Sequence, residues 1–413
     1  MKYRSTAGKA SGRSFEDVVL EGAAPDGSLY MPETVPPYDP PHSGRHEDYL
    51  VKALEAFGAS GVEDLVADAC SRFHHPEVAP IVEVGDYRVL ELFWGPTLSF
   101  KDHAMQVLAL LFNHFLAERD EQRTVLVATS GDTGSAAIEA FRGLAAVRVV
   151  VLYPTGKVSE YQRRQMTTVD DSNVEVLSVA GTFDDCQRLV KEAFRSRAGL
   201  ASANSINWGR IASQIGYYLA AAARMGESFE VVVPTGNFGN AYSAWTAKQM
   251  GVPIQRIVIA TNANRVLYDL YETGEVRAEM ALATLAPAMD IQVPSNLERY
   301  LSDHDATAFS NDFLAGWADD STILETIARV YETHGALIDP HTAAAWAVAD
   351  TLGPAKIPRL VVSTAHPAKF ATTIERATGV SPVVPEWAAI DPELPERDIE
   401  IEPDLEGLTE HLS

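Results

Sequence analysis

RTVLVATSGDTGSAAIEAFRGLAAVRVVVLYP, residues 123–154, is the stretch that decides the fold. It begins with a short apolar run, Val125–Ala128, passes through a glycine-containing turn, and enters an alanine-rich segment that ends at Gly143. A second apolar run, VRVVVLYP, follows at once, so the stretch predicts a β-α-β unit. Strands that are apolar along their whole length are typical of parallel sheets covered by helices on both faces.

Two other stretches repeat this pattern, FEVVVPTGNFGNAYSAWTAKQMG with IQRIVIATN at residues 229–262, and RLVVSTAHPAKFATTIERATG at residues 359–379. Open parallel sheets bind ligands beyond the carboxyl ends of their strands, in the loops that begin the helices. The loops in question are TSGDTG (129–134), PTGNFGN (234–240) and STAHPAKF (363–370). We expect all three to converge on one crevice.

Composition restricts the function. The chain has 413 residues, with 57 acidic and 33 basic side chains and a net charge of −24. Nucleic acids and anionic membranes need basic surfaces, so neither is expected as a partner. There is no membrane-length apolar run and no secretory leader pattern, and only Cys70 and Cys186 are present, which predicts a cytoplasmic, metal-independent protein. An anionic substrate would need a locally positive site.

The loop PTGNFGN can bind an anion. Gly236 and Gly239 permit tight turns, and the helix that follows presents unpaired N–H groups and the positive end of its dipole. The loop matches neither the P-loop nor the G-x-G-x-x-G dinucleotide pattern. Glycine turns of this kind are also often purely structural, and that alternative stays open here.

The other two loops offer further polar groups. TSGDTG forms a second nest in which backbone N–H groups could hold a carboxylate; alternatively, Asp132 or Thr133 simply caps the helix. In STAHPAKF, Ser363 and Thr364 place neutral hydroxyls at a strand end. They belong to a turn or meet the ring nitrogen of a ligand.

A lone lysine completes the set. Lys101 lies in WGPTLSFKDHAMQ, residues 94–106, and most lysines are solvated surface charges. Burial beside Phe100 would lower the pKa of Lys101 and supply a neutral amine. A lysine, a phosphate nest, a carboxylate nest and a neutral hydroxyl together describe a pyridoxal phosphate (PLP) pocket, in which Lys101 carries the cofactor as a Schiff base.

These motifs also resemble a known family, the threonine synthases, which are fold-type II PLP enzymes. The similar stretches, in family order, are MKYRSTAG, LEGAAPDGSLYMPE, GPTLSFKD, ATSGDTGSAAI, GTFDDCQ, NSINWGRI, VPTGNFGN, MDIQVPSNLERYL, DPHTA and STAHPAKF. They span roughly residues 1–370. The resemblance implies an α/β fold like the tryptophan synthase β chain, with two doubly wound parallel-sheet domains and an N-terminal segment.

The resemblance also suggests how the chain divides. The expected units are an N-terminal segment (1–80), a large PLP-binding domain (81–105 and 206–390), a small mobile domain (106–205), and an acidic tail (391–413). The tail carries nine acids against one arginine, which indicates a solvated tail or a late-docking element.

Site residues follow from the resemblance position by position. Lys101 matches the Schiff-base lysine, and Thr364 matches the hydroxyl that meets the pyridine nitrogen. The cofactor phosphate loop corresponds to Gly236, Asn237, Phe238, Gly239 and Asn240. The substrate carboxylate loop corresponds to Ser130, Gly131, Asp132, Thr133 and Gly134. Our candidate donors to the substrate phosphate are Lys157, Ser159, Gln162, Asn204, Ser205, Asn207 and Arg210. The alternative is that Arg163 and Arg164 form a solvated helix face and that Asn207 and Trp208 are a cap and a core residue.

Some positions depart from the family pattern. Trp94 replaces the usual histidine, and tryptophan cannot relay a proton. Ala286 and Ala288 replace hydroxyl residues, Arg265 stands where an acid is usual, and Gly209 where alanine is common. These changes leave the cofactor loop intact and bear on the substrate and on proton transfer.

By resemblance, the substrate is O-phospho-L-homoserine, which reacts with water to give L-threonine and phosphate by β,γ-replacement. Two alternatives remain: a phospho-lyase that releases 2-ketobutyrate from the same substrate, and a PLP-binding homologue without turnover. The only partner expected is this phosphorylated amino acid, and the expected state is a monomer or a homodimer.

Overall fold

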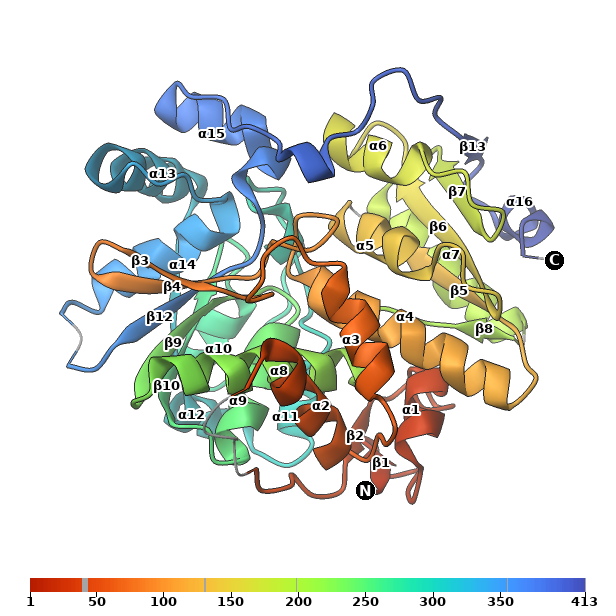
Figure 1. Ribbon diagram of the computed structural model, residues 1–413, viewed down its shortest axis with the longest axis horizontal. Coiled ribbons are helices and arrows are strands. Elements are labelled where there is room, and N and C mark those ends of the chain that lie inside the picture. The colour runs from red at the N-terminus through yellow and green to blue at the C-terminus, as the bar shows by residue number, and fades with distance from the viewer. Residues whose placement is uncertain (39–43, 130, 198, 355, 413) are drawn as a thin grey trace.

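The computed structural model describes residues 1–38, 44–129, 131–197, 199–354 and 356–412. Ser130, one of the expected carboxylate-loop residues, lies outside them. The chain builds two separate β-sheets with helices around each, and a small two-stranded sheet near its N-terminus (Figure 1). This is the α/β architecture with parallel sheets that the apolar runs predicted.

The larger sheet has six strands in the order β11-β10-β9-β12-β4-β3. Their bounds are Phe313–Trp317, Ile254–Thr261, Phe229–Pro234, Arg359–Ser363, Tyr87–Glu91 and Ile81–Val84. All neighbours pair in parallel except β3 and β4, which form an antiparallel edge hairpin. Every residue of the central strands β9 and β12 is buried, which explains their nearly continuous apolar sequence. Because β9 and β12 are neighbours, the loops that follow them leave the sheet at the same edge.

The smaller sheet has five parallel strands in the order β13-β7-β6-β5-β8. Their bounds are Asp398–Ile401, Val174–Val179, Val147–Pro154, Arg123–Ala128 and Leu200–Ala201. Four of them lie within residues 106–205, the range expected for the small domain. The fifth, β13, comes from the acidic end of the chain. That end therefore docks as an edge strand of this sheet, which agrees with the late-docking alternative and not with a solvated tail for residues 398–410.

Helices surround both sheets (Figure 1). Those of the smaller sheet are α5 (Asp132–Phe141), α6 (Glu160–Thr167), α7 (Phe183–Ser196) and α16 (Leu405–Glu410). Those of the larger sheet are α8 (Trp208–Met225), α9 (Gly239–Gln249), α10 (Val266–Thr273), α11 (Leu297–Leu301), α12 (Phe309–Asp312), α13 (Asp320–His334), α14 (Pro340–Thr351) and α15 (Ala371–Thr378). The helix α4 (Lys101–Glu118) packs against both α5 and α8, so it joins the two sheet regions.

The first residues form β1 (Tyr3–Ser5), β2 (Tyr30–Pro32), α1 (Phe15–Glu21), α2 (His46–Ala56) and α3 (Glu63–Ser71). These elements pack on α4 and α8 and complete one apolar core with them. Trp208 lies at the centre of this core, with its ring against those of Tyr3 and Phe57. The N-terminal segment thus supports the two helices whose first residues include Lys101 and Arg210.

The chain between α15 and β13 crosses from the larger sheet region to the smaller one (Figure 1). Trp387 stacks on His74, with ring centroids 4.2 Å apart. The next residue, Ala388, accepts a hydrogen bond from the Tyr161 hydroxyl at 2.9 Å, and Thr167 donates to Glu396 at 2.7 Å. This crossing segment, residues 380–397, therefore fastens α6 to the rest of the molecule.

Among the described residues, no helix is long and apolar enough to cross a membrane, and no cluster of metal-ligating side chains occurs.

Candidate active site

Lys101 is the first residue of α4, and hydrogen bonds between Asp102 and the preceding turn fix it there. The backbone N–H and the hydroxyl of Thr97 donate to the Asp102 carboxylate at 2.8 and 2.7 Å. Burial raises the pKa of Asp102 to about 6, against the lowering effect of these bonds. A Cβ on Gly95 would lie 2.4 Å from that of Asp102, so the motif needs glycine there. The turn GPTLSFKD therefore serves to aim Lys101.

The Lys101 side chain is buried, with its Nζ 5.1 Å from the centre of the Phe100 ring. The Asp132 carboxylate lies 3.3 Å from this Nζ. Burial lowers the pKa of Lys101, the nearby Asp132 charge opposes this, and the Lys369 and Arg210 cations add to the lowering. The direction is the one that the sequence predicted, and it favours the neutral amine that attack on an aldehyde requires.

Asp132 begins α5 and receives polar groups from several elements. Gln162 of α6 donates to its Oδ1 at 2.7 Å, and Lys369 lies 2.8 Å from the same oxygen. Burial alone would raise the pKa of Asp132, but the Lys369 and Lys101 cations hold it well below its usual range. The N–H groups of Gly131 and Gly134 are instead bound by the Thr129 hydroxyl, both at 2.9 Å. The alternative that Asp132 or Thr133 caps the helix is therefore wrong.

The loop after β9 has the geometry of an anion nest. Phe238 adopts a left-handed conformation with φ of 64°, which turns the chain into α9. Among the described residues, the backbone N–H groups of 236–240 donate no hydrogen bond to the protein. A Cβ on Gly236 would lie 2.6 Å from the Cα of Met289, so only glycine permits this approach. Free N–H groups at a helix start suit a phosphate, and the loop fits the cofactor in this respect.

The two asparagines of this loop are held from outside it. The Asn240 Oδ1 accepts hydrogen bonds from the hydroxyls of Tyr217 and Tyr218 on α8, at 2.6 and 2.7 Å. Asn237 accepts a hydrogen bond from the Ser295 N–H and donates to the Ser205 hydroxyl. The cofactor loop and the segment at Ser205 are therefore adjacent.

Thr364 lies next to the lysine turn. It is 5% exposed, and its carbonyl accepts a hydrogen bond from the Phe100 N–H at 2.8 Å. The preceding Ser363 hydroxyl lies 3.0 Å from that of Thr342. Because Phe100 directly precedes Lys101, Thr364 stands close to the backbone that carries the lysine.

Asn207 and Arg210 differ in what they can offer a ligand. The Asn207 side chain accepts from the Gly209 N–H at 2.9 Å and donates to the carbonyls of Val19 and Ser202 at 2.8 and 3.2 Å. It is the N-cap of α8, as the structural alternative had it. The Arg210 guanidinium is buried and donates to the Ala203 carbonyl at 3.4 Å, while its Nε lacks a partner within the described residues. Burial lowers the pKa of Arg210 to about 10.

The remaining phosphate candidates are spread out. Lys157 and Ser159 are exposed on the loop before α6, and Asn204 and Ser205 are half-buried. Ser159 caps α6 by accepting a hydrogen bond from the Gln162 N–H at 3.3 Å. The arginines of α6 are not simply solvated. Both contact Glu396 in the crossing segment, and Arg164 also donates to the Asp391 carbonyl at 2.9 Å.

The unusual residues have partners of their own. The Trp94 indole donates to Glu91 at 2.9 Å and lies against the ring of His75. The Ala288 N–H donates to His341 at 3.2 Å, and the Arg265 guanidinium lies 4.8 Å from the centre of the Trp317 ring.

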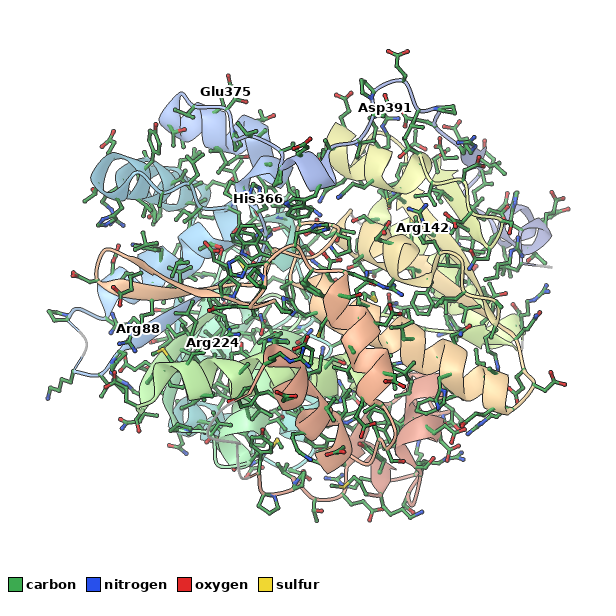
Figure 2. All side chains as sticks on the ribbon, in the orientation of Figure 1. Arg88, Arg142, Arg224, His366, Glu375 and Asp391 are labelled. Atoms are coloured by element: carbon green, nitrogen blue, oxygen red, sulfur yellow. The ribbon has the colours of Figure 1, made fainter. Side chains whose placement is uncertain are left out.

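In Figure 2, His366 lies near the centre of the view, whereas Glu375 and Asp391 project from its edge. Burial lowers the pKa of His366 to about 4, so this imidazole is neutral at physiological pH.

Lys369 is a site residue that the sequence motifs did not predict. It lies in STAHPAKF, one of the three loops singled out above, where a ligand role was predicted only for the hydroxyls of Ser363 and Thr364. Its Nζ also donates to the Thr97 carbonyl at 2.7 Å, so the residue contacts both the lysine turn and the start of α5. A second lysine within a ligand loop was the signal available.

Comparisons with known proteins agree with this geometry. Residues 87–363 match the family model described as pyridoxal-phosphate dependent enzyme. The class that the fold and the site define is therefore a PLP-dependent enzyme of fold type II, and PLP is the cofactor of this chain.

More specific models describe the two ends. Residues 2–54 match the threonine synthase N terminus, and residues 342–412 match the threonine synthase C-terminal model. The chain is 37% identical to the threonine synthase of Pseudomonas aeruginosa, over 93% of this chain and 92% of that one. It is 36% identical to that of Saccharomyces cerevisiae, over 91% and 88%. The PLP-bound threonine synthase structure from Brucella melitensis matches with a TM-score of 0.94 and 37% identity, over 100% and 98%. The chain belongs to the threonine synthase family.

Proposed function

We propose that this enzyme converts O-phospho-L-homoserine and water into L-threonine and phosphate. The observation that carries the proposal is the buried amine of Lys101, held 3.3 Å from Asp132 at the start of α4. A neutral buried amine can both attach the cofactor and, once released, move protons between substrate carbons. When bound, PLP supplies an electron sink for the substrate carbons.

Each loop would then have one task. Residues 236–240 hold the cofactor phosphate through their free N–H groups, and Thr364 meets the ring nitrogen. The start of α5 holds the substrate carboxylate, and we favour Thr133 as its donor, because the N–H groups of Gly131 and Gly134 already donate to the Thr129 hydroxyl. For the substrate phosphate we favour Arg210 and Ser205, because Arg210 is buried without a carboxylate contact and Ser205 adjoins the cofactor loop. Asn207 is excluded from this set, since both hydrogens of its amide serve backbone carbonyls.

Charge supports an anionic substrate. Two basic side chains, Lys369 and Arg210, are buried near Lys101 and Asp132 in a chain whose net charge is −24. Buried cations in excess of anions are costly unless a ligand neutralises them. We also propose that the protein is cytoplasmic, a monomer or a homodimer, and that residues 106–205 with the docked end form a unit that moves to close the site.

The test is to supply the purified holoenzyme with O-phosphohomoserine and to quantify phosphate, threonine and 2-ketobutyrate together, with Lys101→Ala as the control. We expect equal amounts of phosphate and threonine, both lost in the variant. Phosphate with 2-ketobutyrate would identify a phospho-lyase and direct attention to Trp94 and Ala288. If no product forms although the cofactor is attached, the substrate assignment is wrong.

A further inference from the structure

Two buried lysines share one carboxylate in this site. Lys101 lies 3.3 Å from the Asp132 Oδ2, and Lys369 lies 2.8 Å from the Oδ1. Their side chains are 11% and 0% exposed, and that of Asp132 is 7% exposed. One negative charge cannot fully neutralise two ammonium groups in a site with so little exposure to solvent. The contacts around each lysine therefore decide which of them keeps its proton.

Lys369 has the contacts that an ammonium group needs. Besides Asp132, its Nζ has the Thr97 carbonyl at 2.7 Å and the Gln165 Oε1 at 3.4 Å. An ammonium group has three hydrogens to donate, and Lys369 thus has three acceptors. Its backbone is also fixed, because it lies in the 3₁₀ turn Pro367–Phe370, where its N–H donates to the His366 carbonyl at 3.1 Å.

Lys101 has fewer hydrogen-bond acceptors than Lys369. Within the described residues, the Asp132 oxygen at 3.3 Å is the only acceptor of its Nζ, and the Phe100 ring lies beside it. Protonation of Lys101 would leave buried hydrogens without partners, whereas the neutral amine avoids that cost. The two lysines are therefore not equivalent, although they contact the same carboxylate.

We propose that Lys369 is a positioning residue that holds the charge of Asp132 and thereby keeps Lys101 as a free amine, ready to condense with an aldehyde and release water. The proposal rests on the function proposed above only in giving Lys101 the cofactor. Lys369 is not itself a catalytic residue, because it acts through Asp132.

The other charged groups around Lys101 are few. They are Asp132 on α5, Arg210 on α8 and Lys369 in the turn after β12. Asp102 on α4 is also nearby, but its carboxylate accepts hydrogen bonds from Thr97. After burial, the pKa of Lys101 responds to Asp132, which raises it, and to Lys369 and Arg210, which lower it. Replacing Lys369 by a neutral residue removes one lowering charge and leaves Asp132 to Lys101 alone. Both changes raise the pKa of Lys101.

The experiment measures the reactivity of the Lys101 amine against pH in the full-length protein freed of cofactor. Limiting acetic anhydride labels neutral amines, and mass spectrometry quantifies the peptide that contains Lys101. The variants are Lys369→Met, Lys369→Gln and Lys369→Arg, with Gln165→Leu as a control that removes a contact of Lys369 but no charge. We expect the midpoint for Lys101 to rise by about one pH unit or more in the Met and Gln variants, which is roughly tenfold less free amine near neutrality. The Arg and Gln165 variants should keep the wild-type midpoint.

A second readout follows cofactor attachment, trapped by borohydride. In Lys369→Met, attachment should be slower near neutral pH and recover in alkaline buffer. A wild-type midpoint in both neutral variants would overturn the proposal, and so would slow attachment at every pH. If Lys369→Met does not fold, Lys369→Gln decides. Neither readout uses the substrate, so a wrong substrate assignment would leave this result unchanged.

Discussion

Replacing Asp132 with asparagine should destabilise the protein in a way that depends strongly on pH. The carboxylate contacts the Nζ atoms of Lys101 and Lys369 at 3.3 and 2.8 Å, and all three side chains are buried. Asparagine has nearly the same shape but no charge, so two ammonium groups lose their anion. Removing one partner of a buried ion pair typically costs about 3–5 kcal/mol. We expect a loss in that range at pH values below the lowered pKa of Lys101.

The loss should shrink as the pH rises. Burial already lowers the pKa of Lys101, and removing Asp132 removes the charge that opposes this. The folded variant then binds fewer protons than the unfolded chain in the interval between the lowered pKa of Lys101 and the ordinary lysine pKa. Stability rises with pH wherever the unfolded state binds more protons. Deprotonation of Lys101 thus relieves part of the cost in alkaline buffer.

The assay is urea unfolding of the cofactor-free protein, followed by circular dichroism across the pH range. Asp171→Asn is the matched control, because Asp171 pairs with Arg142 at 2.8 Å near the surface, with side chains 26% and 40% exposed. That variant should lose no more than about 1 kcal/mol, with little dependence on pH. A loss in Asp132→Asn that is small throughout, constant, or larger in alkali would refute the reasoning.

Further predictions follow from other contacts. Asn207→Ala should lower the free energy of unfolding by about 1–3 kcal/mol, since it removes a helix cap and two buried hydrogen bonds. Urea unfolding measures this loss, and an unchanged KM would confirm that the amide does not bind substrate. Gly95→Ala should cost at least about 1–3 kcal/mol and reduce cofactor attachment, because the new Cβ meets Asp102 at 2.4 Å; full attachment in an absorbance titration would contradict it. Burial raises the pKa of Asp102 to about 6. Between the ordinary aspartate pKa and about 6, the folded state therefore binds a proton that the unfolded state has lost, and the free energy of unfolding falls as the pH rises through this range. Asp102→Asn should remove that fall, seen as a flatter plot of unfolding free energy against pH.

The sequence predicted the parallel sheets, for a physical reason. Parallel strands buried on both faces must be apolar, and their carboxyl ends share one edge, so runs such as Val125–Ala128 locate both the strands and the loops. The burial of Lys101 did not follow from these runs, because Lys101 lies in the separate stretch 94–106. What the pattern could not give was pairing between distant residues. Nothing local tells that Lys369 would meet Asp132, because only the packed fold brings β12 and α5 together.

Asn207 and the acidic end show two other limits. An asparagine before a helix can cap it or bind a ligand, and only the positions of Val19 and Ser202 decide between these. The segment Asp398–Ile401 carries alternating acids, which leave both a solvated tail and a late-docking element open. It pairs with β7 through backbone groups; Glu400 is exposed at the edge of the sheet, and the half-buried Asp398 accepts a hydrogen bond from the Tyr153 hydroxyl at 2.6 Å. Backbone pairing of an edge strand leaves little trace in side-chain composition.

The position of β13 also bears on how the molecule is made. Four strands of the smaller sheet lie between residues 123 and 201, but β13, which covers the edge of β7, comes only at residues 398–401. Until it arrives, β7 presents an open edge on which another chain can add a strand. The nascent protein therefore carries an aggregation-prone surface while residues 180–397 are synthesised. A chain shortened by its last twenty or so residues would carry that surface permanently.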